Sequence, residues 1–157
     1  MPNLSDVFNL SGDKFIDELF DFVIENGFNS QKSTPIEKTV VYIVTAQGII
    51  ENGGFKYFFE SDFDDGKVSH EEIINYFKKI GSVNTASTLK KILEIFPNSK
   101  PQKNLYKRQE YIEKYIDSDK NRIVDRLESD LFNYMRMESA NLEKYLKNNK
   151  DFFTEIK

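Results

Sequence analysis

Apolar side chains recur every three or four positions through most of the chain, which is the spacing of one face of an α-helix. In the first such segment they are Phe15, Ile16, Leu19, Phe20 and Val23. Ser11 suits the start of this helix, and Asn-Gly at 26–27 suits its end. Thr34 and Glu37 form a capping box around a proline, which predicts a second helix as far as 52–53. Apolar residues surround much of this second helix, so we expect it to be the buried, central one.

The remaining pattern predicts shorter helices separated by polar turns. An aromatic helix at 55–61 leads into an acidic loop, and Ser69 with Glu72 forms a second capping box before a helix at 73–80. Further helices are expected at 84–95, 104–116, 119–136 and 139–149. No strand alternation, internal repeat or low-complexity linker divides the chain. We therefore predict a single compact all-α domain over residues 1–157, with seven or eight helices.

The composition narrows the classes of protein. Among 157 residues, fourteen Phe and eight Tyr supply a core, while Cys and Trp are absent. Without Cys there is no disulfide framework, thiol nucleophile or Cys-based metal site, and a reducing cytoplasm is the simplest compartment. The N-terminus lacks a signal-peptide pattern, and the longest apolar run, VVYIV, is far shorter than a membrane span. We expect a cytoplasmic protein that does not enter a membrane.

Charge is unevenly distributed, and it suggests a binding surface. Residues 1–72 hold fourteen acidic and five basic side chains, and residues 73–157 hold twelve and seventeen. In the first helix, acids follow one another every four residues, with Glu18 beside them: Asp13, Asp17, Asp21 and Glu25. Steps of roughly 6 Å along a helix present negative charge periodically, as a phosphate backbone does. A second acidic cluster consists of Glu60, Asp62, Asp64 and Asp65.

An ordinary solvated helix face is the alternative to a binding stripe. Lys14 within the stripe and a net charge of only −4 favour that alternative. Against it, like charges four residues apart destabilise a helix by about 0.2 to 0.5 kcal/mol per pair, so a purely structural face would more often alternate signs.

The segment Glu60–Glu72 is similar to part of a calcium-binding loop. With Gly66 at position 6, suitable ligands fall at positions 5, 9 and 12, which are Asp65, Ser69 and Glu72. Phe63 then occupies position 3, where it cannot coordinate an ion. The register that brings Asp62 and Asp64 to positions 1 and 3 leaves the glycine one residue too early for the turn. We interpret the segment as an acidic turn followed by a capped helix, without a metal.

Catalytic and nucleic-acid-binding patterns are weak. His70, the sole histidine, is adjacent to two glutamates at a helix start, and we expect a surface residue there rather than a general base. The nucleophile-elbow and zinc-binding motifs are missing. The basic segments 106–115 and 120–126 are interrupted by acids, which predicts a salt-bridged solvent face rather than a nucleic-acid site.

Four short motifs resemble those of the bacterial DNA-mimic protein family: ENGGFKYFFES at 51–61, KKIGS at 78–82, EIFP at 94–97 and LESDLFNYM at 127–135. The resemblance covers roughly residues 45–153, and its most specific element is Asn52, Gly53, Gly54 and Phe55. It implies an all-α fold, dimerisation, no enzymatic activity and an acidic surface that occupies the DNA-binding face of a transcription regulator.

The motif itself is interpreted as structural. Asn52 and Gly53 suit a left-handed helix end, and Gly54 suits a close backbone approach. A phosphate-binding glycine loop is the alternative, but the Lys-Ser/Thr of a P-loop is missing.

The leading hypothesis is a non-catalytic interaction protein, without a cofactor, that forms a homodimer. Its acidic helix and loop would bind the basic, DNA-contacting surface of a regulator or another nucleic-acid-binding protein, with no direct contact to nucleic acid. Two alternatives remain. One is an immunity protein that neutralises a basic nuclease toxin, since the same electrostatics would serve. The other is a metal-responsive module built on the degenerate calcium loop.

Overall fold

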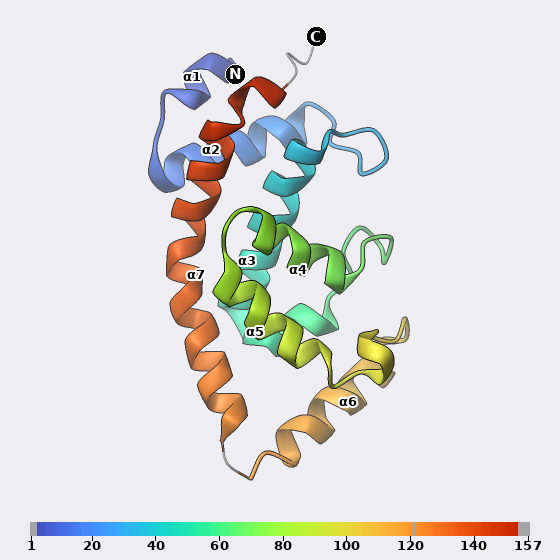
Figure 1. The fold of residues 1–157 in the computed structure, drawn as a ribbon. Coiled ribbons are helices and arrows are strands. Elements are labelled where there is room, and N and C mark those ends of the chain that lie inside the picture. The colour runs from blue at the N-terminus through green and yellow to red at the C-terminus, as the bar shows by residue number, and fades with distance from the viewer. Residues whose placement is uncertain (1–2, 121, 154–157) are drawn as a thin grey trace.

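Two long helices, α3 (Pro35–Glu60) and α7 (Ile123–Asn148), pack side by side and organise the fold in a computed structural model of the chain (Figure 1). The structure describes residues 3–120 and 122–153. Helix α2 (Gly12–Glu25) packs across both long helices, and α1 (Leu4–Phe8) precedes it. On another side, α4 (His70–Lys79) and α5 (Val83–Leu93) form a pair against the long helices. Helix α6 (Leu105–Asp117) contacts α3, and short 3-10 turns occupy Pro97–Ser99 and Lys150–Phe152.

The all-α prediction is confirmed. Seven α-helices and no strand occur in the described part of the chain, whose nearest approach to β-structure is an isolated bridge between Phe63 and Val68. Residues 1–2, 121 and 154–157 of the predicted domain lie outside the described residues. The apolar positions expected at the centre of α3 are buried, among them Val40, Ile43 and Ile50.

Both predicted capping boxes are present. The backbone N–H of Thr34 donates to Glu37 Oε2 at 2.7 Å, and the N–H of Glu37 donates to Thr34 Oγ1 at 3.4 Å. Ser69 and Glu72 repeat this arrangement at the start of α4, with distances of 2.7 and 3.1 Å. Each box satisfies backbone donors that a helix start leaves open, which is why these two boundaries can be read from the sequence.

The predicted break after Asn52 is a kink inside α3 rather than a gap between helices. Gly54 has φ +66°, in the left-handed region, whereas Gly53 has φ −158°. The left-handed position was expected at Asn52 and Gly53 and lies instead at Gly54. A Cβ placed on Gly54 would lie 1.8 Å from Glu128 Oε1, so this residue also provides the close approach between α3 and α7. Burial raises the pKa of Glu128, as does Asp125, while a hydrogen bond to the Phe55 backbone opposes them.

Helix α7 differs from the two helices predicted at 119–136 and 139–149. It is continuous through the intervening residues, and Glu138 among them is buried against α5 and accepts hydrogen bonds from the Ser82 and Thr85 hydroxyls. Its first turn is capped by Asp119, whose carboxylate accepts the N–H groups of Ile123 and Val124 at 2.9 and 2.8 Å. Residue 119 therefore precedes the helix instead of starting it.

We expect Gly54→Ala to destabilise the fold strongly. The substitution combines a left-handed backbone with a steric overlap on the Glu128 carboxylate, which would have to leave its place against the Phe55 backbone, so it should cost about 1 kcal/mol more than the matched control Gly66→Ala. Gly66 also has a positive φ, +81°, but has open space around its Cβ position. Urea unfolding of both variants measures the difference. Equal losses would show that the contact with Glu128 does not constrain the position.

Candidate protein-binding surface

The acids of α2 lie on the exposed side of the helix. Asp13, Asp17, Asp21 and Glu25, which we call the acidic row, are all exposed, and Glu18 is partly buried. Phe15, Leu19 and Val23 are buried on the opposite side of α2. At a rise of about 1.5 Å per residue, the acidic row extends about 18 Å along the helix.

Helix α7 fixes the start of α2 and so the position of the acidic row. The N–H of Gly12 donates to Glu143 Oε2 at 2.9 Å, and Lys147 Nζ donates to the carbonyl of Leu10 at 2.7 Å. Lys147 also pairs with Glu143 at 2.8 Å and lies 4.9 Å from the ring centre of Phe15. The hydrogen bond from Lys147 lowers the pKa of Glu143. A charge pair on one helix therefore holds the first turn of another.

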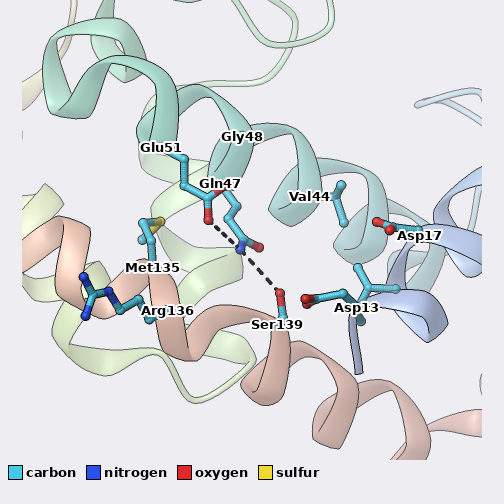
Figure 2. A pocket seen from close by; sticks show the side chains of 10 residues that line it. Asp13, Asp17, Val44, Gln47, Gly48, Glu51, Met135, Arg136 and Ser139 are labelled. Atoms are coloured by element: carbon cyan, nitrogen blue, oxygen red, sulfur yellow. Dashed lines mark hydrogen bonds between the residues drawn. The ribbon is translucent and has the colours of Figure 1, made fainter. Parts of the chain in front are cut away.

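Two members of the acidic row face a groove between α2, α3 and α7. Figure 2 shows Asp13 and Asp17 on one side of this groove, which has a volume of about 470 Å³. Glu51 of α3 contributes a third carboxylate, which accepts a hydrogen bond from Gln47 at 3.0 Å. Arg136 of α7 is the basic residue in the lining. Glu51 was not singled out by sequence reasoning, because only the packing of α3 against α2 brings it near the acidic row.

The second predicted cluster does not form one free acidic patch. Glu60 lies 3.8 Å from Lys56, and its side chain is only 17% exposed. Asp62 forms an ion pair at 3.0 Å with Arg108. Asp64 accepts a hydrogen bond from Ser30 at 2.5 Å. Asp62 and Asp65 are the exposed members of the cluster, and Asp62 is already paired with a cation.

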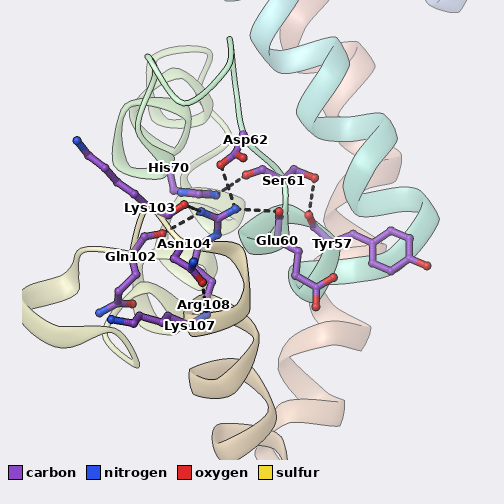
Figure 3. Close-up of polar contacts among 10 residues, drawn as sticks. All are labelled: Tyr57, Glu60, Ser61, Asp62, His70, Gln102, Lys103, Asn104, Lys107 and Arg108. Carbon is purple, nitrogen blue, oxygen red and sulfur yellow. Dashed lines mark hydrogen bonds and ion pairs between the residues drawn. The ribbon is translucent and has the colours of Figure 1, made fainter.

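Arg108 is a buried structural side chain that sequence reasoning missed, and it pairs with a member of the acidic cluster. It lies in a basic segment predicted to be a solvent face, but it is only 2% exposed, so that prediction is wrong for this residue. Figure 3 shows its guanidinium between the end of α3 and the segment before α6. Nη1 donates to the carbonyls of Gln102 and Lys103 at 2.9 and 3.0 Å, and Nη2 donates to the carbonyl of Glu60 at 3.1 Å. The available signal was its spacing: Arg108 and the buried Ile112 lie four residues apart on α6.

The acidic loop is built as a tight turn. Asp64, Asp65 and Gly66 all have positive φ, and the N–H of Val68 donates to the carbonyl of Phe63 at 3.3 Å. Phe63 is buried, and Glu72 is engaged in its capping box, so two positions of the calcium pattern serve the fold instead. Within residues 3–120 and 122–153, no three His, Cys, Asp or Glu side chains are grouped so that they could hold a metal ion.

His70 is buried, which contradicts the predicted surface position. It is 7% exposed, and its ring lies among Phe58, Phe59 and Phe63 at centroid distances of 5.5, 5.4 and 5.7 Å. Its Nε2 lies 2.9 Å from the carbonyl oxygen of Ser61. Burial lowers the pKa of His70. The aromatic residues before the loop supply this environment, and their contact with the histidine is not visible from its sequence neighbours.

The fold and surface define a helical protein with an exposed acidic helix. A family model described as DMP19-like protein matches residues 31–149, about three quarters of the chain. The chain therefore belongs to the DMP19-like protein family, a non-catalytic family of DNA mimics. The matched residues include α3 to α7 and Arg108, whereas α2 and its acidic row precede them. Comparison with curated proteins and with solved structures found no match.

A separate property concerns membranes. None of the helices in the described ranges combines the length and the apolar character needed to cross a bilayer.

We expect Arg108→Met to lower the free energy of unfolding by about 3 kcal/mol, because it removes a buried cation that binds three carbonyl groups and Asp62. Lys107→Met is the matched control on the neighbouring, exposed position, and it should change stability by less than about 0.5 kcal/mol. Asp62→Asn should cost under about 1 kcal/mol, because that side chain is 54% exposed. Chemical unfolding tests all three, and similar losses for Arg108→Met and Lys107→Met would refute the role of Arg108.

Proposed function

We propose that this protein is a non-catalytic interaction module whose acidic surface mimics DNA. Its partner is the basic, DNA-contacting face of a transcription regulator or of another DNA-binding protein. The observation that carries the proposal is the acidic row on α2, which displays four carboxylates along one exposed side of a rigidly packed helix. Membership of the DMP19-like family supports the same function.

The acidic row has the electrostatic character that a DNA-binding surface recognises. A protein binds the DNA backbone largely through Lys and Arg, which neutralise regularly spaced phosphates. Carboxylates at intervals of roughly 6 Å offer the same cations a comparable series of negative charges. The row also costs helix stability, since each like-charged pair four residues apart is unfavourable by a few tenths of a kcal/mol. A binding role explains why this unfavourable arrangement is present.

The groove beside α2 extends the proposed surface. Asp13, Asp17 and Glu51 surround an opening with Val44 and Met135 in its lining. Long basic side chains have apolar stems and charged ends, so such an opening suits a lysine or arginine of the partner. Asp64 and Asp65 are secondary parts of the proposal. Glu60 and Asp62 contribute less than the sequence suggested, because neighbouring cations already offset their charge.

Two further features belong to the proposal. We infer a homodimer, which agrees with the resemblance to the DNA-mimic family and with the exposed apolar side chains of Val83 and Met137, 58% and 60% accessible. Val83 follows Ser82 in the sequence, and Met137 precedes Glu138. Because the side chains of Ser82 and Glu138 are hydrogen-bonded to each other, Val83 and Met137 lie where α5 contacts α7.

We also propose a cytoplasmic location, consistent with a chain that has no Cys.

The double variant Asp17→Asn, Asp21→Asn tests the acidic row. We expect partner binding to weaken at least about tenfold, the equivalent of about 1.4 kcal/mol, while the melting temperature does not fall. The matched control is Glu110→Gln, Glu113→Gln, which makes the same change in net charge at exposed positions of α6. Wild type and both variants are used to capture partners from native lysate, and the captured protein is then purified and titrated by calorimetry.

The titration is repeated with increasing salt and with duplex DNA as competitor. Mimicry requires that DNA and this protein exclude each other and that affinity falls with salt. A ternary complex with DNA, or equal weakening by both double variants, would refute the proposed surface. Capture of a basic nuclease, inhibited by this protein, would instead identify an immunity protein.

A further inference from the structure

His70 combines two features that make a contact sensitive to protonation: its ring is enclosed by apolar side chains, and one ring nitrogen contacts a backbone carbonyl. The ring is enclosed by three phenylalanines from the end of α3 and from the acidic loop, which we define as Ser61–Ser69. The group that faces Nε2 is a backbone carbonyl, which cannot donate, so this contact is a hydrogen bond when Nε2 carries a proton. The contact joins the first residue of α4 to Ser61, the residue that follows α3.

Some groups around the ring oppose its protonation, and others favour it. Arg108 of α6 is a buried, permanently charged cation that disfavours a second positive charge nearby. Asp62 favours the charged ring, but its carboxylate is already paired with Arg108. The hydrogen bond to the Ser61 backbone favours the charged ring more strongly than Arg108 opposes it, and the Phe58 backbone adds to this, so burial is the dominant cause of the lowered pKa of His70. His70 and Arg108 also line a cleft at the protein surface. Four further charged residues line this cleft and are exposed to solvent: Asp65, Glu71, Lys100 and Lys103.

We propose that His70 is a pH-sensitive latch for the acidic loop. When neutral, it holds the loop closed through its contact with Ser61 and its packing among the phenylalanines. When protonated, it places an additional cation in an aromatic enclosure beside Arg108, and the loop opens to hydrate it. The loop carries Asp64 and Asp65, so acidification changes how this segment displays its carboxylates.

The direction of the pH dependence follows from the burial of the ring. Because the pKa of His70 is lower in the closed loop than the ordinary value of about 6.5, the open loop binds the proton more tightly. The stabilisation by His70 is therefore fully present above about pH 6.5 and is lost as the pH falls towards the pKa of the closed state. Glu128 and Glu138 have raised pKa values, so acidification has the opposite effect on the regions they stabilise.

Hydrogen exchange measured by mass spectrometry at pH 7.5 and pH 5.5 tests the latch on the isolated full-length protein. After correction for intrinsic exchange, we expect opening of residues 61–72 to increase several-fold, up to about tenfold, at the lower pH. Exchange in α2 and α7 should not increase in parallel. His70→Gln is the control variant, because its amide can donate to Ser61 but does not titrate, so its loop should be equally protected at both pH values. The result does not depend on the proposed partner.

A second measurement keeps the test decisive if His70→Gln does not fold. The ring proton of His70 in the wild-type protein is followed by NMR from pH 8 to pH 4.5, together with the amide signals of the loop. We expect the ring to titrate below pH 6.5 and the loop signals to shift with it. Titration at or above 6.5, unchanged loop protection between pH 7.5 and 5.5, or an equal pH response in His70→Gln would each overturn the latch.

Discussion

Three different glutamates of α7 each contact the start of a neighbouring helical segment, and the arrangement of the fold depends on these contacts. Glu128 lies against Gly54 and the Phe55 backbone, where the second part of α3 begins. Glu138 accepts the hydroxyls of the first turn of α5, and Glu143 accepts the N–H of Gly12 at the start of α2. Glu128 and Glu143 meet backbone N–H groups, which lack intrahelical acceptors at a helix start and carry partial positive charge, whereas Glu138 meets hydroxyl groups. Helix α7 therefore positions three elements through glutamate side chains that accept hydrogen bonds from the start of each.

These contacts explain which parts of the fold were predictable. Capping boxes such as Thr34 with Glu37 involve residues three apart, so the sequence contains both partners side by side. The start of α2 has no side-chain bond from its own cap residue, Ser11, and depends on Glu143 more than a hundred positions away. The contact between α7 and α5 through Glu138 likewise joins residues more than fifty positions apart. Helical periodicity indicates that an element exists, but it does not identify a remote partner that caps or extends it.

The candidate site also has one part that the sequence predicts and one part that depends on remote residues. The exposure of the acidic row followed from the helical period, because the buried Phe15, Leu19 and Val23 require the intervening acids to face outward. The acidic loop could not be judged so simply, because Arg108 and His70 reach it from other elements. A charged side chain and a histidine are most often exposed, and each is buried here because specific carbonyl groups accept its hydrogen bonds. The sequence does not indicate which carbonyl groups will accept these hydrogen bonds.

The scaffold and the acidic row are therefore distinct parts of the molecule. The matched family region contains the kink at Gly54, the buried Arg108 and most of α7, all of which hold the helices together. Several carboxylates in this region are engaged: Asp62 with Arg108, Glu138 with two hydroxyls and Glu143 with Lys147. The acidic row lies outside that region, on a helix that α7 orients at its first turn while its carboxylates face solvent. Because a paired carboxylate must break an existing contact before it can meet a new cation, the acids of α2 are more readily offered to a basic partner than these paired acids.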